Sequence, residues 1–151
     1  MSSLNLDTES RFKIRQVAAQ LGIAVETIRM YERAGLLLPR RTASGQRVFS
    51  EADIHWIACL RRLLTERGLN LEGIRRMLAL LPCWQIKPCS EIERNNCPAY
   101  LNAMQPCWMV KPQVAGACRT LPCHDCNVYK SAQHCDNLKA LLRRYMAPCQ
   151  Q

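Results

Sequence analysis

The stretch KIRQVAAQLGIAVETIRMYERAGLLLPRRTASGQRVFSEADI, residues 13–54, decides the fold of the first half of the chain. A helix is predicted over 11–21 and is expected to stop at Gly22. Its apolar residues recur at the spacing of one helical face, at Ile14, Val17, Ala18 and Leu21. A second helix is predicted over 25–34, ending before Gly35. Two short helices separated by a tight glycine-containing turn are typical of a helix-turn-helix.

Two short extended runs follow these helices. LLLPRR at 36–41 and QRVFS at 46–50 are joined by the turn sequence TASG, and together they predict a β-hairpin, or wing. Basic residues flank its tip, namely Arg40, Arg41 and Arg47.

Helices are also predicted beyond the wing. Ser50 and Asp53 fit a capping box that opens a helix running to about Arg67. Asn70 is the expected cap of a further helix over 71–81, and Gly68 separates the two.

Together these elements resemble the N-terminal winged-helix domain of the MerR family of bacterial regulators. The resemblance covers about residues 12–80, and it rests on T-I-R-x-Y-E-x-x-G-L-L, on the S-G-x-R of the wing and on the spacing to G-L-x-L-x-x-I. It implies a homodimer without enzymatic activity that binds double-stranded promoter DNA and acts on RNA polymerase. Met30 and Gln46 depart from the aromatic residues that the family usually has there.

The resemblance also assigns roles to individual residues. The helix that begins at Val25 would enter the major groove, where Glu26 and Thr27 would reach base edges. Arg29 and Tyr31 would contact phosphates, with packing against the wing as the alternative for Tyr31. The wing arginines, Arg40, Arg41 and Arg47, would hold the DNA backbone or the neighbouring minor groove. Glu32 and Arg33 are expected to form a solvated face.

Bulk composition is compatible with this interpretation. The chain has 151 residues and a net charge of +9, which suits a polyanionic partner without proving one. The first residues do not resemble a signal peptide, and no apolar run approaches the roughly 20 residues that span a bilayer. A cytoplasmic protein without a membrane partner is therefore expected. Thiols stay reduced in that compartment, so a chain with 10 cysteines indicates metal or cluster ligands more readily than a disulfide framework.

A seven-residue pattern occurs twice in the second half. Residues 82–88 read PCWQIKP and residues 106–112 read PCWMVKP, and each copy continues with a cysteine and a C-x-x-Y. This arrangement resembles a small cysteine- and tryptophan-repeat module found on various bacterial sensors. Recurrent prolines exclude a long helix here. The dimerisation helix usual in the family is therefore missing or shortened to 71–81.

The candidate ligands are the cysteines of the repeat and one beyond it: Cys83, Cys89 and Cys97; Cys107, Cys118, Cys123 and Cys126; and Cys135. Cys118-x4-Cys123-x2-Cys126 matches the plant-type ferredoxin spacing for three ligands of an iron–sulfur cluster. All-cysteine ligation favours the cluster. Zinc is the competitor, because Cys123-x2-Cys126 is equally a zinc half-site. Disulfides or free redox thiols are a third possibility.

The sequence thus predicts a mainly α-helical chain in three parts. A winged helix-turn-helix domain spans 11–81, a small irregular cysteine-rich module spans 82–130, and a short C-terminal helix spans 131–147. The first hypothesis is a regulator that senses redox state or cluster integrity. The alternatives are a sensor of zinc or another soft metal ion, and a structural zinc module for a protein partner. A thiol oxidoreductase is disfavoured, because no βαβ pattern surrounds Cys123-x2-Cys126.

Overall fold

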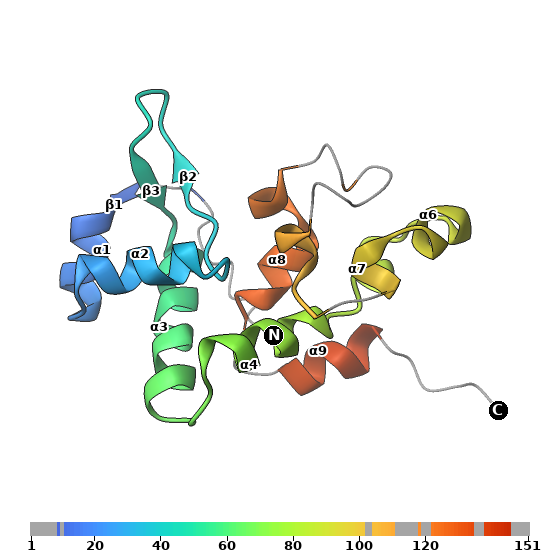
Figure 1. Ribbon diagram of the computed structural model, residues 1–151. Coiled ribbons are helices and arrows are strands. Elements are labelled where there is room, and N and C mark those ends of the chain that lie inside the picture. Colours follow the sequence, from blue (N-terminus) through green and yellow to red (C-terminus); the bar gives the residue numbers. More distant parts are fainter. Residues whose placement is uncertain are drawn as a thin grey trace. The chain divides into compact units, whose positions relative to one another are not determined.

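The computed structural model describes residues 9, 11–101, 104–110, 118, 122–134 and 138–145, and these are mainly helical, as predicted (Figure 1). The chain divides into two compact units, Met1–Arg67 and Gly68–Gln151. The predicted division into 11–81, 82–130 and 131–147 stays a prediction.

The first unit begins with a short strand that the sequence did not predict. Strand β1, Phe12–Lys13, pairs antiparallel with β3, Arg47–Phe49, in the register Phe12↔Phe49. Helix α1 therefore begins at Ile14 instead of residue 11 and runs to Leu21. Gly22 ends it with φ 65°, a left-handed conformation that glycine adopts without steric cost. Helix α2 spans Val25–Arg33 and completes the predicted helix-turn-helix.

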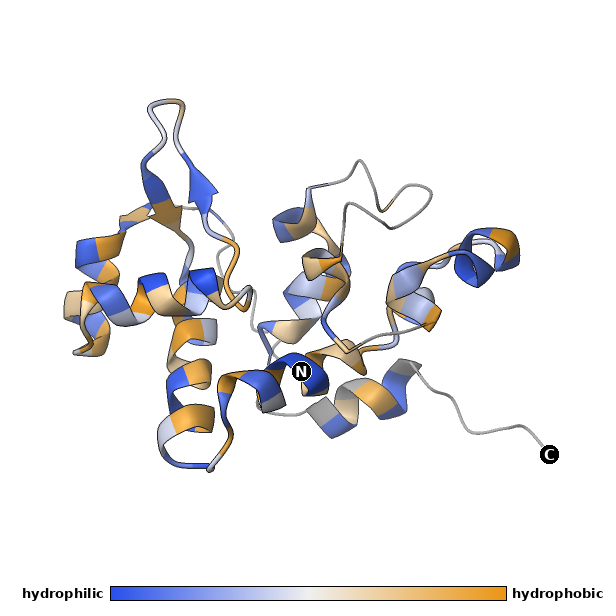
Figure 2. Ribbon diagram, viewed as in Figure 1, coloured by the Kyte–Doolittle hydropathy of each residue, from blue (hydrophilic) through white to orange (hydrophobic). Residues whose placement is uncertain are grey.

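The predicted wing is present. Strand β2, Arg40–Arg41, pairs antiparallel with β3, and the strand order is β1-β3-β2. The hairpin extends away from α1 and α2 (Figure 1), and β2 is hydrophilic (Figure 2). Gly45 turns its tip with φ 86°, and the Thr42 N–H donates to the Gln46 carbonyl over 2.8 Å. Arg41 and Arg47 face each other in this register.

Helix α3, Glu51–Thr65, carries much of the first unit's core. Ser50 caps it as predicted, because its hydroxyl accepts from the Asp53 N–H at 3.1 Å and the Asp53 carboxylate accepts from the Ser50 N–H at 2.9 Å. Trp56 is fully buried, and its indole N–H donates to the Leu36 carbonyl at 2.8 Å. This bond anchors the chain between α2 and the wing.

The second unit consists of short helices. Helix α4, Leu71–Ala79, is capped by Asn70, whose side chain accepts from the Gly73 N–H at 2.7 Å. The remaining elements are α5 Cys83–Ile86, α6 Glu91–Asn95, α7 Pro98–Leu101, η1 Cys107–Met109, η4 Cys123–Asp125, α8 Asn127–Ala132 and α9 Leu138–Tyr145. The predicted irregular module is thus built largely from helical turns that begin at or just after a proline. In the part of the chain that the structure describes, no helix is long and apolar enough to cross a membrane.

Candidate DNA-binding surface and thiol cavity

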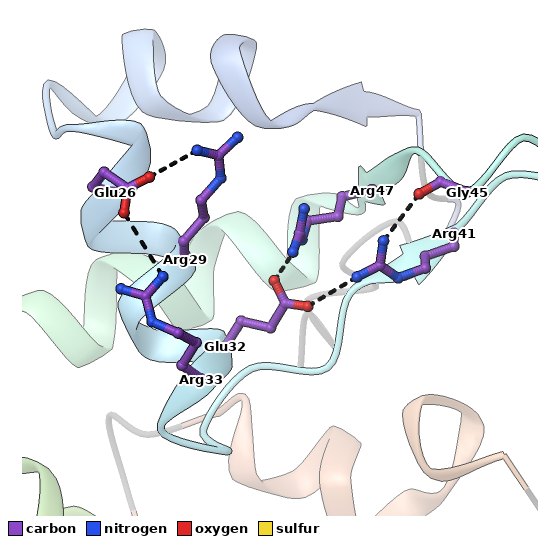
Figure 3. Close-up of polar contacts among 7 residues, drawn as sticks. All are labelled: Glu26, Arg29, Glu32, Arg33, Arg41, Gly45 and Arg47. Carbon is purple, nitrogen blue, oxygen red and sulfur yellow. Dashed lines mark hydrogen bonds and ion pairs between the residues drawn. The ribbon is translucent and has the colours of Figure 1, made fainter.

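The exposed face of α2 carries a cluster of charged side chains. Glu26, on the first turn, accepts from Arg29 at 2.7 Å and lies 3.7 Å from Arg33 (Figure 3). The hydrogen bond from Arg29 lowers the pKa of the Glu26 carboxyl, which is exposed. Thr27 lies beside Glu26 and is half-buried. Carboxylates at such a position can accept from cytosine amino groups, and guanidinium groups bind phosphates.

Glu32 joins α2 to the wing, although the sequence predicted a solvated residue there. Its carboxylate accepts from the Arg47 Nε at 2.5 Å and from the Arg41 Nη2 at 3.3 Å (Figure 3). Only 21% of the Glu32 side chain is exposed. Like charges opposite each other across an antiparallel pair destabilise it, and Glu32 supplies the counter-charge between Arg41 and Arg47. The sequence spacing between Glu32 and the wing does not predict these ion pairs.

The other residues that were predicted to contact DNA differ in how exposed their side chains are. Arg41 is exposed and also donates to the Gly45 carbonyl at 2.9 Å, while Arg40 and Arg47 are half-buried. Tyr31 is 2% exposed, and burial raises the pKa of its hydroxyl. This position favours the packing alternative for Tyr31 over a phosphate contact.

Replacing Glu32 with glutamine is expected to loosen the wing. The two guanidinium groups would lose a half-buried charged acceptor, which is worth about 1–2 kcal/mol. Hydrogen exchange of the β2 and β3 amides should therefore quicken by about tenfold. Glu26→Gln is the matched control, because its ion pairs are exposed and should contribute little. Equal acceleration by both substitutions would refute the special role of Glu32.

The second unit contains a cavity whose wall is rich in thiols. Its volume is about 60 Å³. The wall contains seven of the eight predicted ligands: Cys83, Cys89, Cys97, Cys107, Cys118, Cys123 and Cys126. All seven are free and half-buried. Cys135 lies outside the described residues. The structure therefore brings together cysteines that are up to 43 positions apart in sequence, from Cys83 to Cys126.

The thiols are close enough to influence one another's ionisation. Burial, together with the neighbouring Cys97, Cys118 and Cys89, raises the pKa of Cys83 to about 11. Burial also raises the pKa of Cys107, and the nearby Cys83 thiol contributes to the same shift. These thiols are therefore neutral at physiological pH unless a cation is present to stabilise the thiolates.

The donor set fits a soft metal or an iron–sulfur centre, although the atoms are not in ligand geometry. Thiolates are the ligands preferred by zinc, copper(I) and iron–sulfur centres. Within the described ranges, no group of three or more histidine, cysteine or acidic side chains is placed to hold a metal ion. A bound centre would therefore require the thiols to move closer together.

Aromatic side chains accompany the thiols in both copies of the repeat. Trp84 and Tyr100 contact each other edge to face, with ring centroids 5.2 Å apart and an interplanar angle of 85°. Trp108 and Tyr129 repeat this contact at 5.2 Å and 84°. Trp84 and Trp108 also line the cavity. The duplicated sequence thus produces a duplicated structure.

A helix-turn-helix with a basic wing defines a class of DNA-binding domains. Residues 12–81 match the family described as MerR HTH family regulatory protein. This segment of the chain is similar to that family, and the relatives that it matches include proteins named as regulators.

Individual relatives agree with the family match. The chain is 43% identical over 65 residues to the putative heat shock protein HspR of Streptomyces coelicolor, covering 42% of this chain and 43% of that protein. It is 42% identical over 62 residues to the HTH-type transcriptional regulator AdhR of Bacillus subtilis, covering 40% and 44%. It is 35% identical over 72 residues to the mercuric resistance operon regulatory protein of Bacillus cereus, covering 47% and 54%. The chain thus spans about half the length of these relatives, or less.

Proposed function

We propose that this protein is a cytoplasmic, dimeric transcription regulator of the MerR type, controlled by an inorganic centre in its thiol cavity. The observation that carries the proposal is the convergence of seven cysteines on one cavity, in a chain whose residues 12–81 match the MerR family. The centre would sense the regulatory signal. The winged helix-turn-helix would act on double-stranded promoter DNA together with RNA polymerase.

The DNA-binding half of the proposal rests on the charged surface of the first unit. Helix α2 would enter the major groove with Glu26, Thr27 and Arg29 near the bases and phosphates. The wing would place Arg41 and Arg47 on the DNA backbone, where guanidinium groups bind phosphate oxygens in pairs. Glu32 supports the wing in the free protein because it holds both arginines.

An iron–sulfur cluster is the first form proposed for the centre. Cys118, Cys123 and Cys126 have the plant-type ferredoxin spacing, and all three line the cavity. Trp84 and Trp108 would limit the access of water, which influences the potential of a cluster. Oxidation or loss of the cluster would then be the signal.

Soft metal ions are the second candidate for the centre, and one observation favours them. Seven thiols exceed the four that a single tetrahedral zinc ion takes, so the cavity has enough ligands for more than one ion. The mercuric resistance relative matches only 47% of this chain, so its name does not indicate which metal the cavity would bind.

Elemental analysis and an absorption spectrum of anaerobically purified protein test the proposal. Iron with sulfide and visible absorption would support the cluster, whereas stoichiometric zinc without iron would support metal ions. Protein that contains no metal, and that binds neither iron and sulfide nor zinc on reconstitution, would exclude an inorganic centre.

Promoter binding by a Cys118→Ser/Cys123→Ser/Cys126→Ser variant then tests regulation. We expect this variant to bind DNA but to lose the response to the centre. Loss of DNA binding together with loss of fold would instead indicate a structural site for a protein partner.

A further inference from the structure

The two copies of the repeat can be aligned without a gap around their last two cysteines. Cys89-x7-Cys97-x2-Tyr100 in the first copy matches Cys118-x7-Cys126-x2-Tyr129 in the second. The Cys-Trp pairs at 83–84 and 107–108 match as well. This alignment leaves one cysteine without a counterpart, since Cys123 takes the place that Arg94 has in the first copy.

Local structure supports the same alignment. The Trp–Tyr contacts have the same centroid distance, 5.2 Å, in the two copies. Cys97 and Cys126 each immediately precede a helix, and each carbonyl accepts the N–H of the residue four positions later, over 3.0 Å. Matched cysteines therefore begin matched helices, α7 and α8.

Matched thiols also line the same cavity. Cys83 and Cys107 occupy the same position in their copies, and both are on the cavity wall. Cys118 and its counterpart Cys89 are on that wall as well. Helix α5 of the first copy contacts α8 of the second, so the copies fold into one body. The six matched cysteines thus surround the cavity as two related sets of three.

Six thiolates satisfy two tetrahedral ions when two of the thiolates are shared. Each ion needs four ligands, and the two sets supply six. We propose that Cys83, Cys89, Cys97, Cys107, Cys118 and Cys126 hold a binuclear centre of two soft divalent ions, with Cys83 and Cys107 as the shared ligands and Cys123 outside the ligand set.

Cavity-wall residues are consistent with these roles. Shared ligands must lie between the ions, and Cys83 and Cys107 are the matched cysteines of the two Cys-Trp pairs, both on the wall of the one cavity. Two divalent ions with six thiolates carry a net negative charge. Lys87 and Arg94 line the cavity and would offset it, while the Glu93 carboxylate is engaged with the Ser90 N–H at 3.1 Å. Arg94 lies over the Tyr100 ring, with its guanidinium carbon 5.7 Å from the centroid.

This inference rests on the proposed thiol centre, and it selects the metal-ion form of that centre. Binding would release the protons of the six thiols, because only thiolates are ligands. It would also draw the thiols into ligand distance.

Cadmium titration of the full, reduced chain under anaerobic conditions tests the proposal, with native mass spectrometry to count the bound ions. Cys118→Ser and Cys123→Ser form a matched pair, since each removes one thiol from the cavity wall. We expect two cadmium ions in the wild-type chain and in Cys123→Ser, at most one in Cys118→Ser, and none tightly bound in Cys83→Ser. Cys118→His, which restores a zinc ligand, should recover a second ion when zinc is used.

The possible results distinguish a failure of the binuclear centre from a failure of the proposed function. One ion per wild-type chain, or a cluster of iron with sulfide, would overturn the binuclear centre and leave the proposed regulator intact. An equal loss of ions in Cys123→Ser and Cys118→Ser would overturn the matched ligand set. Absence of any metal binding would overturn the inorganic centre as well. If Cys118→His did not bind a second zinc ion, the loss of metal in Cys118→Ser would be explained by misfolding. The assignment of Cys118 as a ligand would then be refuted.

Discussion

Replacing Arg41 and Arg47 together by glutamine is expected to weaken promoter binding by about 10²-fold or more at 0.1 M salt. Each guanidinium would lose a charge-assisted bond to phosphate, which is worth about 1.5–3 kcal/mol. The two residues face each other across β2 and β3, so both are placed to contact one stretch of backbone. The slope of log affinity against log salt should also fall by about two for each chain, because each lost phosphate contact removes about one.

Fluorescence anisotropy with promoter DNA at several salt concentrations measures both effects. Arg143→Gln/Arg144→Gln is the matched control, because it removes the same charge from two exposed residues of α9. The control should keep most of the affinity. The wing assignment would be wrong if the control lost as much affinity as the wing variant, or if the wing variant kept the wild-type salt slope.

Removing the proposed inorganic centre is expected to unfold the second unit and to leave the first unit folded. Most of the large, fully buried side chains lie in the first unit, including Trp56, Phe49 and Ile57. The second unit's main contributions among the described residues are Tyr129, Ile74 and Pro82. A unit with so small an apolar core depends on other sources of stability, and structural zinc sites supply roughly 10 kcal/mol.

Hydrogen exchange before and after treatment with a strong chelator measures this difference. Protection of the α8 amides should disappear, whereas protection of the α3 amides should be unchanged. Restoring the metal should restore α8. Persistent protection of α8 in metal-free protein would show that the second unit folds without its centre.

Much of the first unit could be predicted because its signals are local. The capping box of Ser50 and Asp53, the stop at Gly22 and the turn at Gly45 each depend on a few neighbouring residues. Strand β1 could not be predicted in this way. Its two residues pair with β3, which lies 37 positions away for Phe12 and Phe49, and they carry no strand pattern of their own.

The candidate sites could also be predicted only where they depend on local sequence. Composition and spacing identified the cysteines of the second half, but only the fold shows that seven of them share one cavity. Glu32 was missed because a charged residue at the end of a helix usually faces solvent. Its role depends on the strands of the wing lying beside α2 at Arg41 and Arg47, which is a tertiary contact.

Positions of the tryptophans make the thiol cavity observable by intrinsic fluorescence. Two of the chain's three tryptophans, Trp84 and Trp108, line the cavity, while Trp56 is fully buried in the first unit. Trp108 is 8% exposed, so its emission should be bluer than that of the half-buried Trp84. In a Trp56→Phe background all remaining indole emission would come from the cavity wall. Occupancy of the proposed centre could then be followed by fluorescence in the intact protein, including in its proposed complex with DNA.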